Sequence, residues 1–364
     1  MLFHFIIIFL TIAFSTLTSE HVSAGTDMNK KAESEQAITP VRSGDKYKNW
    51  IPTQMLADGN ALSVTWDWIK GGERTTPKGD IPVVALNEKS FPEIIHEGLA
   101  FSWLGHSSVL LEISGCRILI DPVLSTYASP IPLFVKRFSN PPVTAEQLPK
   151  IDIVLITHDH YDHLDKNIVK ILSRQGSYFL VPKGVGGHLR SWGIPEKKIE
   201  ELTWWQQTSY NNLSLACVPA RHFSGRGLFD GNETLWAGWV IQSKSKRVYC
   251  SGDTGYADHF KAIGEAFGPF DLTIIKVGAY SEKWPEIHIN PEQAVQAHIE
   301  VQGKFLLPVH WATFNLALHP WDEPIIRTIK AAEENNVRLT IPLIGEVVNI
   351  ESTTDYKEWW THLQ

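Results

Sequence analysis

Cysteine is scarce in this sequence. Only Cys116, Cys217 and Cys250 occur among its 364 residues, and each stands in an apolar, strand-like stretch. Three is an odd number, so they do not form a complete set of disulfide bonds within the chain. We therefore interpret all three as small, buried hydrophobic side chains.

Clusters of basic residues are missing as well. The net charge is −7 with histidine neutral, and no block of lysine and arginine occurs anywhere in the chain. Proteins dedicated to nucleic acids usually present a basic face, so we expect no nucleic-acid partner. The content of 43% hydrophobic and 20% charged residues is that of an ordinary globular protein.

Apolar runs long enough to span a bilayer are absent after the first 20 residues. The N-terminal stretch itself has no charged side chain before Glu20, and the small residues Ser23 and Ala24 follow it. This pattern is typical of an export signal cleaved after Ala24, although the usual basic residues at its start are missing. We therefore predict a signal peptide or N-terminal anchor over residues 1–24, and an exported protein that is periplasmic or membrane-associated.

The rest of the chain divides into segments that differ in composition and in hydrophobic pattern. Residues 25–95 form a polar linker followed by an irregular arm with several prolines and glycines. Between residues 96–350, strand-like runs come in two series, each followed by alternating helical and strand patterns. This order predicts an α/β fold of two packed sheets covered by helices, an αβ/βα four-layer sandwich. One helix is expected to begin at Pro291 with Asn290 as its N-cap, and residues 351–364 form a C-terminal tail.

The stretch LITHDHYDHLD crowds three histidines and three aspartates behind an apolar, strand-like run. In extended backbone, side chains two residues apart project the same way, so His158 and His160 can reach one cation. Asp162 and His163 come at the turn beyond and can hold a second cation. Because imidazole and carboxylate are the ligands that zinc-class ions prefer, the stretch predicts a metal site.

Three later residues have the same placement at the end of an apolar strand: His222, Asp253 and His310. Asp253 is flanked by Gly252 and Gly255, where the backbone can approach other segments closely. A carboxylate in such a position can bridge two cations. We therefore expect these residues to complete the metal site.

Taken together, these motifs resemble the metallo-β-lactamase superfamily. The HxHxDH element is followed by a later His, Asp and His in the order of that family, and the resemblance covers about residues 96–345. The stretches WLGH, GDTGY and HINPEQA are more specifically similar to the branch that contains N-acyl-phosphatidylethanolamine-hydrolysing phospholipase D and its bacterial relatives. One departure is Ala312 in HWATF, where relatives usually have glycine.

The resemblance implies two divalent metal ions, expected to be Zn²⁺, and it assigns their ligands. One ion is assigned to His158, His160 and His222. The other is assigned to Asp162, His163 and His310, with Asp253 bridging the two ions and also acting in catalysis. The resemblance places His288 at the mouth of the site, in contact with the substrate or the leaving group.

Four other residues near these motifs receive interpretations of their own. Asp121 and Asp159 are candidates to orient the ligand imidazoles, because such rings usually donate their second N–H to a carboxylate or carbonyl. His106 and His188 lie in stretches typical of the branch, and we interpret both as structural.

The function predicted from the resemblance is hydrolysis by a hydroxide that bridges two metal ions. The first hypothesis is a phospholipase D-type phosphodiesterase that acts on N-acyl-phosphatidylethanolamine or a related phospholipid. Two alternatives are a metal-dependent lactonase or other ester hydrolase, and a non-catalytic metal-binding envelope protein. The chain has 14 tryptophans, several of them near predicted loops, which suits a lipid substrate and peripheral membrane contact. Nothing in the sequence indicates an oligomeric state.

Overall fold

A computed structural model describes residues 38–57, 61–87, 90, 98–131, 134–351 and 356–363. The signal peptide or anchor predicted over residues 1–24 lies outside the described residues. Among the helices of the described ranges, none has the length and apolar character that a membrane crossing requires.

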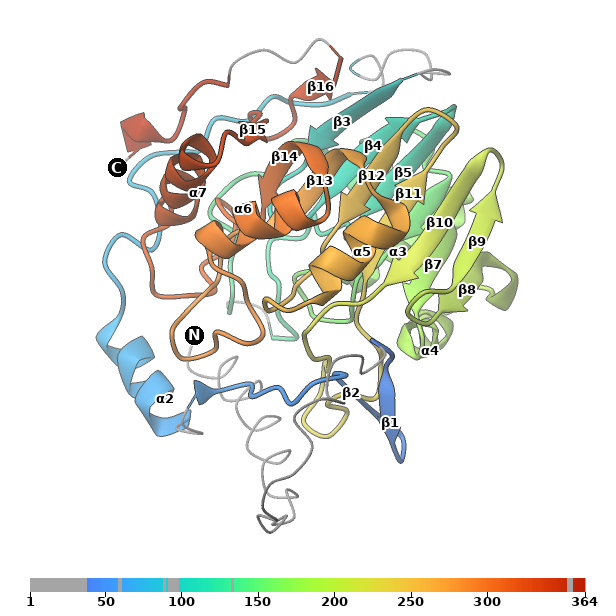
Figure 1. Ribbon diagram of the computed structural model, residues 1–364, viewed down its shortest axis with the longest axis horizontal. Coiled ribbons are helices and arrows are strands. Elements are labelled where there is room, and N and C mark those ends of the chain that lie inside the picture. Colours follow the sequence, from blue (N-terminus) through green and yellow to red (C-terminus); the bar gives the residue numbers. More distant parts are fainter. Residues whose placement is uncertain are drawn as a thin grey trace.

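Two seven-stranded sheets form the centre of the molecule (Figure 1). The first sheet has the order β16 (Val347–Asn349), β3 (Leu99–Trp103), β4 (Val109–Ile113), β5 (Cys116–Ile120), β6 (Ile153–Leu155), β7 (Tyr178–Pro182) and β8 (Ile199–Leu202). The second has the order β15 (Arg338–Leu339), β14 (Gly303–Val309), β13 (Phe270–Lys276), β12 (Arg247–Cys250), β11 (Gly238–Gln242), β10 (Leu213–Val218) and β9 (Gln207–Tyr210). In each sheet an antiparallel part continues into a parallel part, in which β5 to β8 and β12 to β15 pair in parallel.

Helices cover the outer face of each sheet. The first sheet carries α3 (Lys166–Gln175) and α4 (Val185–Ser191), and the second carries α5 (His259–Phe267), α6 (Pro291–Glu300) and α7 (Glu323–Glu334) (Figure 1). Short 3-10 helices lie at η3 (Ala145–Gln147), η4 (Glu196–Lys198) and η5 (Thr361–Leu363). The predicted four-layer α/β sandwich is therefore confirmed.

The alternation of side chains along the strands explains how the layers pack. On β4, Leu111 points into the cluster between the two sheets, whereas Leu110 points into the cluster beneath α3 and α4. All five residues of β4 are almost fully buried, as expected for a strand with helices on one face of its sheet and a second sheet on the other. Cys116, Cys217 and Cys250 are buried and form no disulfide, as the sequence indicated.

The start of α6 agrees with its sequence signals. The helix begins at Pro291, and the Asn290 side chain accepts a hydrogen bond from the backbone N–H of Gln293. The Gln293 side chain in turn accepts from the backbone N–H of Asn290, which completes a capping box. This cap fixes the end of the segment that carries His288.

The N-terminal arm lies across one end of the sandwich. It contains the hairpin β1 (Val41–Ser43) and β2 (Lys46–Lys48), and then helix α2 (Ala61–Lys70). Just after β2, Asn49 brackets the backbone of His222: its amide donates to the His222 carbonyl at 2.9 Å and accepts from the His222 N–H at 3.1 Å. The arm therefore holds one of the predicted metal ligands in place.

The C-terminal residues also pack into the core. Trp360 is buried, and Trp359 stacks on Trp311 with ring centroids 5.3 Å apart. Trp311 in turn stacks on Trp103 of β3 at 5.5 Å. Because Trp311 follows His310 directly, this stack of rings supports the end of β14 where a predicted ligand stands.

Candidate metal centre

The seven predicted ligands lie together where strands of both sheets end. They follow β6, β10, β12 and β14 in the chain, and their side-chain nitrogens and oxygens form overlapping groups that can hold metal ions. In these groups the ligand atoms lie within 4.8 Å of one another. The sequence prediction of one joint site is consistent with this arrangement, while the role of each residue as a ligand stays a prediction.

The first group consists of three imidazoles. Nε2 of His158 lies 2.8 Å from Nδ1 of His160, and Nε2 of His222 lies 3.4 Å from the same Nδ1. These three nitrogens converge on one point, as the alternating positions of His158 and His160 in the sequence suggested.

The second group contains Asp162, His163 and His310. Oδ2 of Asp162 lies 3.5 Å from Nε2 of each of the two histidines. The members therefore present one oxygen and two nitrogens to a common point.

Asp253 connects the two groups. Its Oδ2 lies 3.1 Å from Nε2 of His310 and 4.0 Å from Nε2 of His222, which belong to different groups. Its Oδ1 lies 3.5 Å from Nε2 of His163. A carboxylate that reaches members of both groups has the position of a bridging ligand.

Hydrogen bonds behind the site determine which ring nitrogen of His158, His163 and His222 faces the site. Nδ1 of His163 donates to Oδ2 of Asp121 at 2.7 Å, so its Nε2 faces the site. The Thr157 hydroxyl donates to the same carboxylate oxygen at 2.6 Å and accepts from Nδ1 of His158 at 2.9 Å. Nδ1 of His222 donates to the Ile287 carbonyl at 3.0 Å. The expected orienting role of Asp121 agrees with these contacts, whereas the part played by Thr157 was not predicted.

Asp159 has a different role from the one suggested for it. Its carboxylate accepts from Nε2 of His188 at 3.1 Å, from the Gly225 N–H at 2.8 Å and from the Thr234 hydroxyl at 2.9 Å, and none of these donors is a ligand imidazole. Burial alone would raise the pKa of this carboxyl, but the hydrogen bond from His188, the nearby His160 ring and the Gly225 N–H lower it to about 2. Asp159 therefore ties the loop after His222 to the loop that carries His158, and His188 acts with it.

His106, which the sequence indicated to be a structural residue only, contacts the site directly. Its Nε2 donates to Oδ2 of Asp162 at 2.9 Å, and its ring packs on that of His310 with centroids 4.0 Å apart. Burial and the neighbouring His310 lower the pKa of His106 to about 3, so the ring is neutral at pH 7. His106 orients Asp162 as Asp121 orients His163, and no spacing in the sequence distinguishes it from a core histidine.

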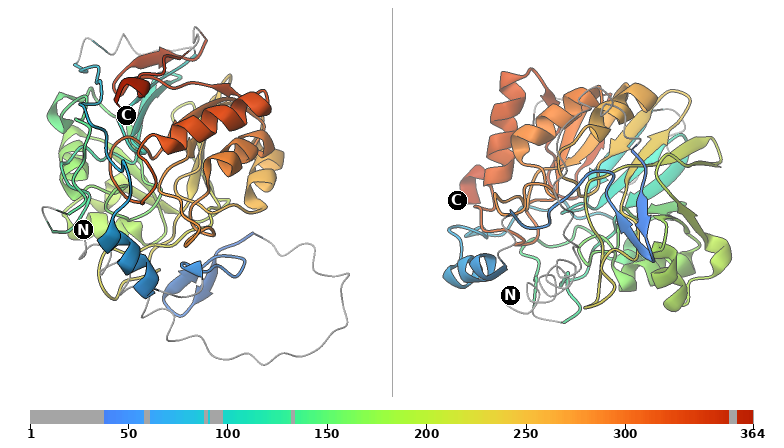
Figure 2. Two further views of the ribbon diagram at one scale, coloured as in Figure 1. Left: turned by 90° about the vertical axis from the view of Figure 1, so that its left-hand side faces the viewer. Right: turned by 60° about the horizontal axis from the view of Figure 1, so that its bottom comes forward.

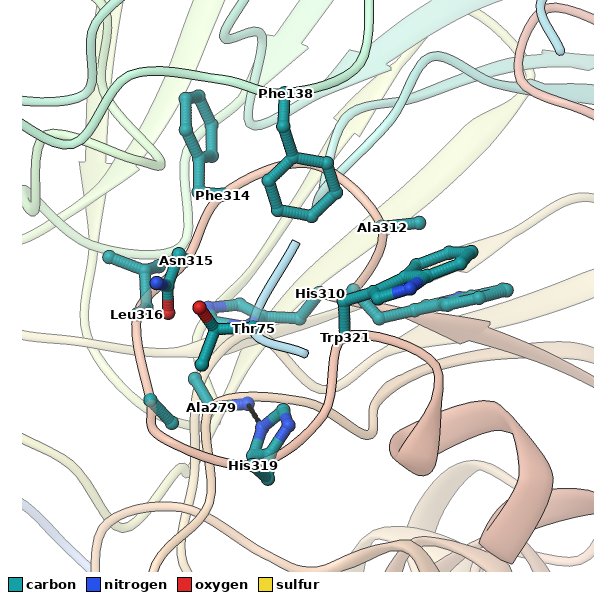
Figure 3. Close-up of a pocket in the computed structure, with 12 residues that line it drawn as sticks. Thr75, Phe138, Ala279, His310, Ala312, Phe314, Asn315, Leu316, His319 and Trp321 are labelled. Atoms are coloured by element: carbon teal, nitrogen blue, oxygen red, sulfur yellow. Dashed lines mark hydrogen bonds between the residues drawn. The ribbon is translucent and has the colours of Figure 1, made fainter. Parts of the chain in front are cut away.

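The segment between β13 and α6 forms another wall of the site. It carries His288, whose Nε2 lies 3.5 Å from Oδ2 of Asp253 and whose side chain is mostly buried. His319 fixes the start of this segment, because its Nε2 accepts from the Ala279 N–H at 3.0 Å (Figure 3). In Figure 3 the His310 ring lies at the wall of a neighbouring pocket among mostly apolar side chains, including Phe138 and Phe314.

Lys276, the last residue of β13, was not predicted as a site residue. Its side chain is fully buried, and Nζ lies 2.6 Å from Nδ1 of His288. Burial lowers the pKa of this ammonium to about 8, although the carboxylates of Asp253 and Asp162 oppose that effect. In the sequence it is a lone lysine at the end of an apolar run, which is also the pattern of an exposed strand end.

Several buried polar atoms indicate that the site suits a cation. Among the described residues, Nε2 of His163, both ring nitrogens of His310 and Oδ1 of Asp253 are buried without a hydrogen-bond partner. Each such atom costs about 1–3 kcal/mol when it is left unpaired. Nitrogen and carboxylate donors of this kind fit divalent ions of the zinc class, which would satisfy these atoms.

The protonation of the site also indicates that it suits a cation. Burial, together with neighbouring imidazoles, holds the pKa of His158 and of His222 well below the usual range although the Asp253 carboxylate opposes this, so both rings keep free lone pairs. Burial would also lower the pKa of His163, but the carboxylates of Asp253, Asp162 and Asp121 raise it well above the usual range. Three carboxylates thus gather around mostly neutral imidazoles, and a cation would balance their charge.

Comparison with known proteins agrees with this geometry. The beta-lactamase superfamily domain matches residues 116–311, more than half of the chain. The chain belongs to the metallo-β-lactamase superfamily. The resemblance seen in its motifs is therefore confirmed, and the chain is a metal-dependent hydrolase of this fold.

Three relatives illustrate the similarity. An uncharacterized protein of Mycobacterium tuberculosis is 45% identical over 341 residues, which cover 91% of this chain and 89% of that protein. N-acyl-phosphatidylethanolamine-hydrolyzing phospholipase D 1 of Caenorhabditis elegans is 37% identical over 235 residues, which cover 60% of this chain and 65% of that enzyme. Igni18, a metallo hydrolase from Ignicoccus hospitalis, has the same fold with a TM-score of 0.54 at 23% identity, covering 71% of this chain and 99% of its own.

The contacts of Asp121 lead to a prediction about metal affinity. We expect Asp121→Asn to weaken zinc binding by roughly 10- to 100-fold, because an amide no longer holds His163 with its Nε2 lone pair toward the site. Competition with a chromogenic chelator would measure the affinity. The control is Asp152→Asn, which changes a carboxylate at the opposite end of the first sheet, where it accepts from the Arg117 N–H. Equal zinc affinity in the two variants would contradict the orienting role of Asp121.

Proposed function

We propose that this metal-dependent hydrolase is a phospholipase D-type phosphodiesterase that binds two divalent ions, in the first instance Zn²⁺, and acts on N-acyl-phosphatidylethanolamine or a related phospholipid. The observation that carries the proposal is the position of Asp253, whose two oxygens reach both groups of candidate ligands. A pair of metal ions held in this way is well suited to an in-line displacement at phosphorus. The name of the Caenorhabditis elegans relative supports the choice of substrate.

The ions, when bound, would supply a nucleophile from water near neutral pH and neutralise charge on the phosphoryl oxygens. The chain's own residues then position the reacting groups. Asp121 and Thr157 keep His163 and His158 from rotating, and His106 keeps Asp162 in place. With the ions in place, Oδ2 of Asp253 would be the group that accepts a proton from the attacking water.

A groove beside the metal-binding loop gives room for a substrate larger than a headgroup. Its volume is about 900 Å³, and Tyr161, between two candidate ligands in the sequence, lines it. Leu124, Tyr127, Pro130 and Trp192 add apolar or aromatic surface to a lining that also contains charged side chains such as Lys166 and Arg226. Grooves of this size accommodate ligands considerably larger than a headgroup.

Helix α2 supports peripheral contact with a membrane. Leu62, Trp66 and Ile69 lie on one face of the helix with exposed fractions of 83%, 57% and 59%. The opposite face, with Val64 and Trp68, packs in one cluster with Trp284 and Ile287 of the segment that carries His288. In both views of Figure 2, α2 lies at the margin of the molecule. A face of leucine, tryptophan and isoleucine suits the headgroup region of a bilayer.

A substrate screen tests the proposed function. Zinc-loaded protein is expected to convert N-acyl-phosphatidylethanolamine and water to phosphatidic acid and N-acylethanolamine, which mass spectrometry would identify. His158→Ala, which removes a candidate ligand, serves as the inactive control. Turnover of lactones without turnover of phosphodiesters would favour the lactonase alternative. Stoichiometric zinc without turnover of either substrate class would favour a metal-binding protein without catalysis.

The apolar face of α2 leads to a second prediction. We expect Leu62→Ser, Trp66→Ser and Ile69→Ser together to weaken binding to phospholipid vesicles by about 10-fold or more, since each loses apolar area that would be buried in lipid. The rate of hydrolysis of a phospholipid substrate in vesicles should fall more than that of a short-chain, monomeric substrate. Flotation with vesicles would measure binding. The control pair is Ile299→Ser and Ile326→Ser, which are also exposed but lie on α6 and α7. An equal loss in both variants would contradict the role of α2.

We also propose that the protein is exported, on the strength of the apolar N-terminal stretch and Ala24. Sequencing the N-terminus of the protein recovered from the cell envelope would test this, with Gly25 as the expected first residue. An unprocessed N-terminus in a cytosolic fraction would contradict it.

A further inference from the structure

The histidines around the site differ in what their outer ring nitrogen contacts. Nδ1 of His163, His158 and His222 faces a carboxylate, a hydroxyl that is already donating, and a backbone carbonyl. Each of these partners can only accept, so each ring carries a proton on Nδ1 and turns its Nε2 toward the site. Nε2 is then the nitrogen through which these three rings can bind a metal ion, whereas His160 turns its Nδ1 toward the site.

His288 faces the opposite kind of partner. Its Nδ1 lies 2.6 Å from Nζ of Lys276, which also donates to the Gly278 carbonyl at 2.9 Å. An ammonium group has donors and no lone pair, so Nδ1 of His288 must accept. The proton of a neutral His288 ring then resides on Nε2.

Position alone would not distinguish His288 from the ligands. Its ring nitrogen belongs with His222 and Asp253 to a group whose ligand atoms lie within 4.8 Å of one another. The backbone on both sides of the ring is also fixed, because the Ile287 carbonyl accepts from His222 and the Ile289 N–H donates to the Thr254 carbonyl at 2.9 Å. The partner of Nδ1 is therefore the feature that separates it from the others.

We infer that Lys276 fixes His288 as the Nε2–H tautomer, which makes His288 a hydrogen-bond donor at the site and excludes it from the metal ligands. Lys276 is in this sense a positioning residue, since it acts through His288.

The donor has a target in the proposed reaction. Nε2 of His288 lies 3.5 Å from Oδ2 of Asp253, at the edge of the group of ligands and with its side chain partly open to solvent. An N–H there can donate to a phosphoryl oxygen or to the departing alkoxide, whose negative charge grows as the phosphorus–oxygen bond breaks. This step rests on the proposed function, whereas the tautomer and the exclusion from the metal do not depend on the substrate.

Nitrogen NMR of protein labelled with ¹⁵N-histidine tests the tautomer directly. Long-range proton–nitrogen correlations should show His288 with a bare Nδ1 and a protonated Nε2, both with and without zinc, and the signals missing from His288→Gln assign the ring. In Lys276→Met this preference should be lost. A His288 ring protonated on Nδ1 in the unsubstituted protein would overturn the inference.

Metal content and kinetics give independent readouts. His288→Gln and Lys276→Met should both retain the full complement of zinc, since neither residue is a ligand; loss of a metal ion in His288→Gln would also overturn the inference. With the substrate found in the screen, Lys276→Met should lower kcat about 10- to 100-fold with KM nearly unchanged. His288→Gln, which keeps an N–H donor near the position of Nε2, should retain more activity than His288→Leu.

A matched control lies on the same strand. Thr273→Val removes the hydroxyl that contacts Nδ1 of the buried His298, 2.7 Å away and remote from the metal ligands. This variant should leave the His288 signals and kcat unchanged. If Lys276→Met shifts the tautomer and no substrate is hydrolysed by the unsubstituted protein, the proposed function fails and the inference about His288 stands. If the substrate is hydrolysed and Lys276→Met alters neither the tautomer nor kcat, the inference fails and the function stands.

Discussion

Replacing Asp253 with asparagine is expected to lower kcat for hydrolysis by about 10³-fold, which corresponds to about 4 kcal/mol of transition-state stabilisation. The reason is the position of the carboxylate, which reaches His310 and His163 of one group and His222 of the other. The amide has nearly the same shape but carries no charge, so it cannot hold two cations at a fixed spacing or accept a proton. Steady-state kinetics and zinc content measured on the same samples would check the prediction.

The expected zinc content makes this variant informative. The asparagine variant should bind fewer than two zinc ions per chain. Of the two ions, the one that is bound less tightly should lose the most affinity. Asp271→Asn is the control, because Asp271 lies at the opposite end of the second sheet and accepts from the Arg247 N–H. An Asp253→Asn protein with full zinc and undiminished kcat would show that the carboxylate neither bridges nor takes part in proton transfer.

The ligands could be predicted from the sequence because their signal is local. His158 and His160 alternate at the end of an apolar run, and His222, Asp253 and His310 follow three other runs of the same kind. Since strands of a sheet that run in parallel end at the same edge, residues at these ends meet in space. The fold could also be predicted, because the order of strand and helix patterns restricts the ways in which the layers can pack.

The supporting residues could not be predicted, since their roles depend on contacts between distant segments. His106 and Lys276 stand 56 and 12 positions from Asp162 and His288, which they contact, and neither has a distinctive spacing. Asn49 reaches His222 across 173 positions from an arm that has little regular pattern. The departure at Ala312 also has a structural counterpart, because its φ of 55° lies in the region that favours glycine.

Gly255→Ala is expected to lower kcat by roughly 100-fold, the effect of displacing reacting groups by about 1 Å. A Cβ at this position would overlap the backbone carbonyl of Glu286, so one of the two segments must move. Asp253 lies two residues before Gly255, and His288 lies two residues after Glu286, so either movement shifts a catalytic candidate. The close approach that the glycines around Asp253 suggested in the sequence is thus made at Gly255 to the segment that carries His288.

Kinetics, zinc content and thermal unfolding of this variant would separate misplacement from unfolding. The control is Gly187→Ala, because Gly187 lies in helix α4 with open space around its Cβ position, where alanine stabilises a helix by up to about 1 kcal/mol. We expect Gly255→Ala to remain folded at 25 °C with a lower Tm and a reduced kcat, while Gly187→Ala keeps the kcat of the unsubstituted protein. A Gly255→Ala protein with unchanged kcat would mean that the Glu286 segment can move away without displacing His288, and the rigid placement of that histidine beside Asp253 would then have no part in the reaction.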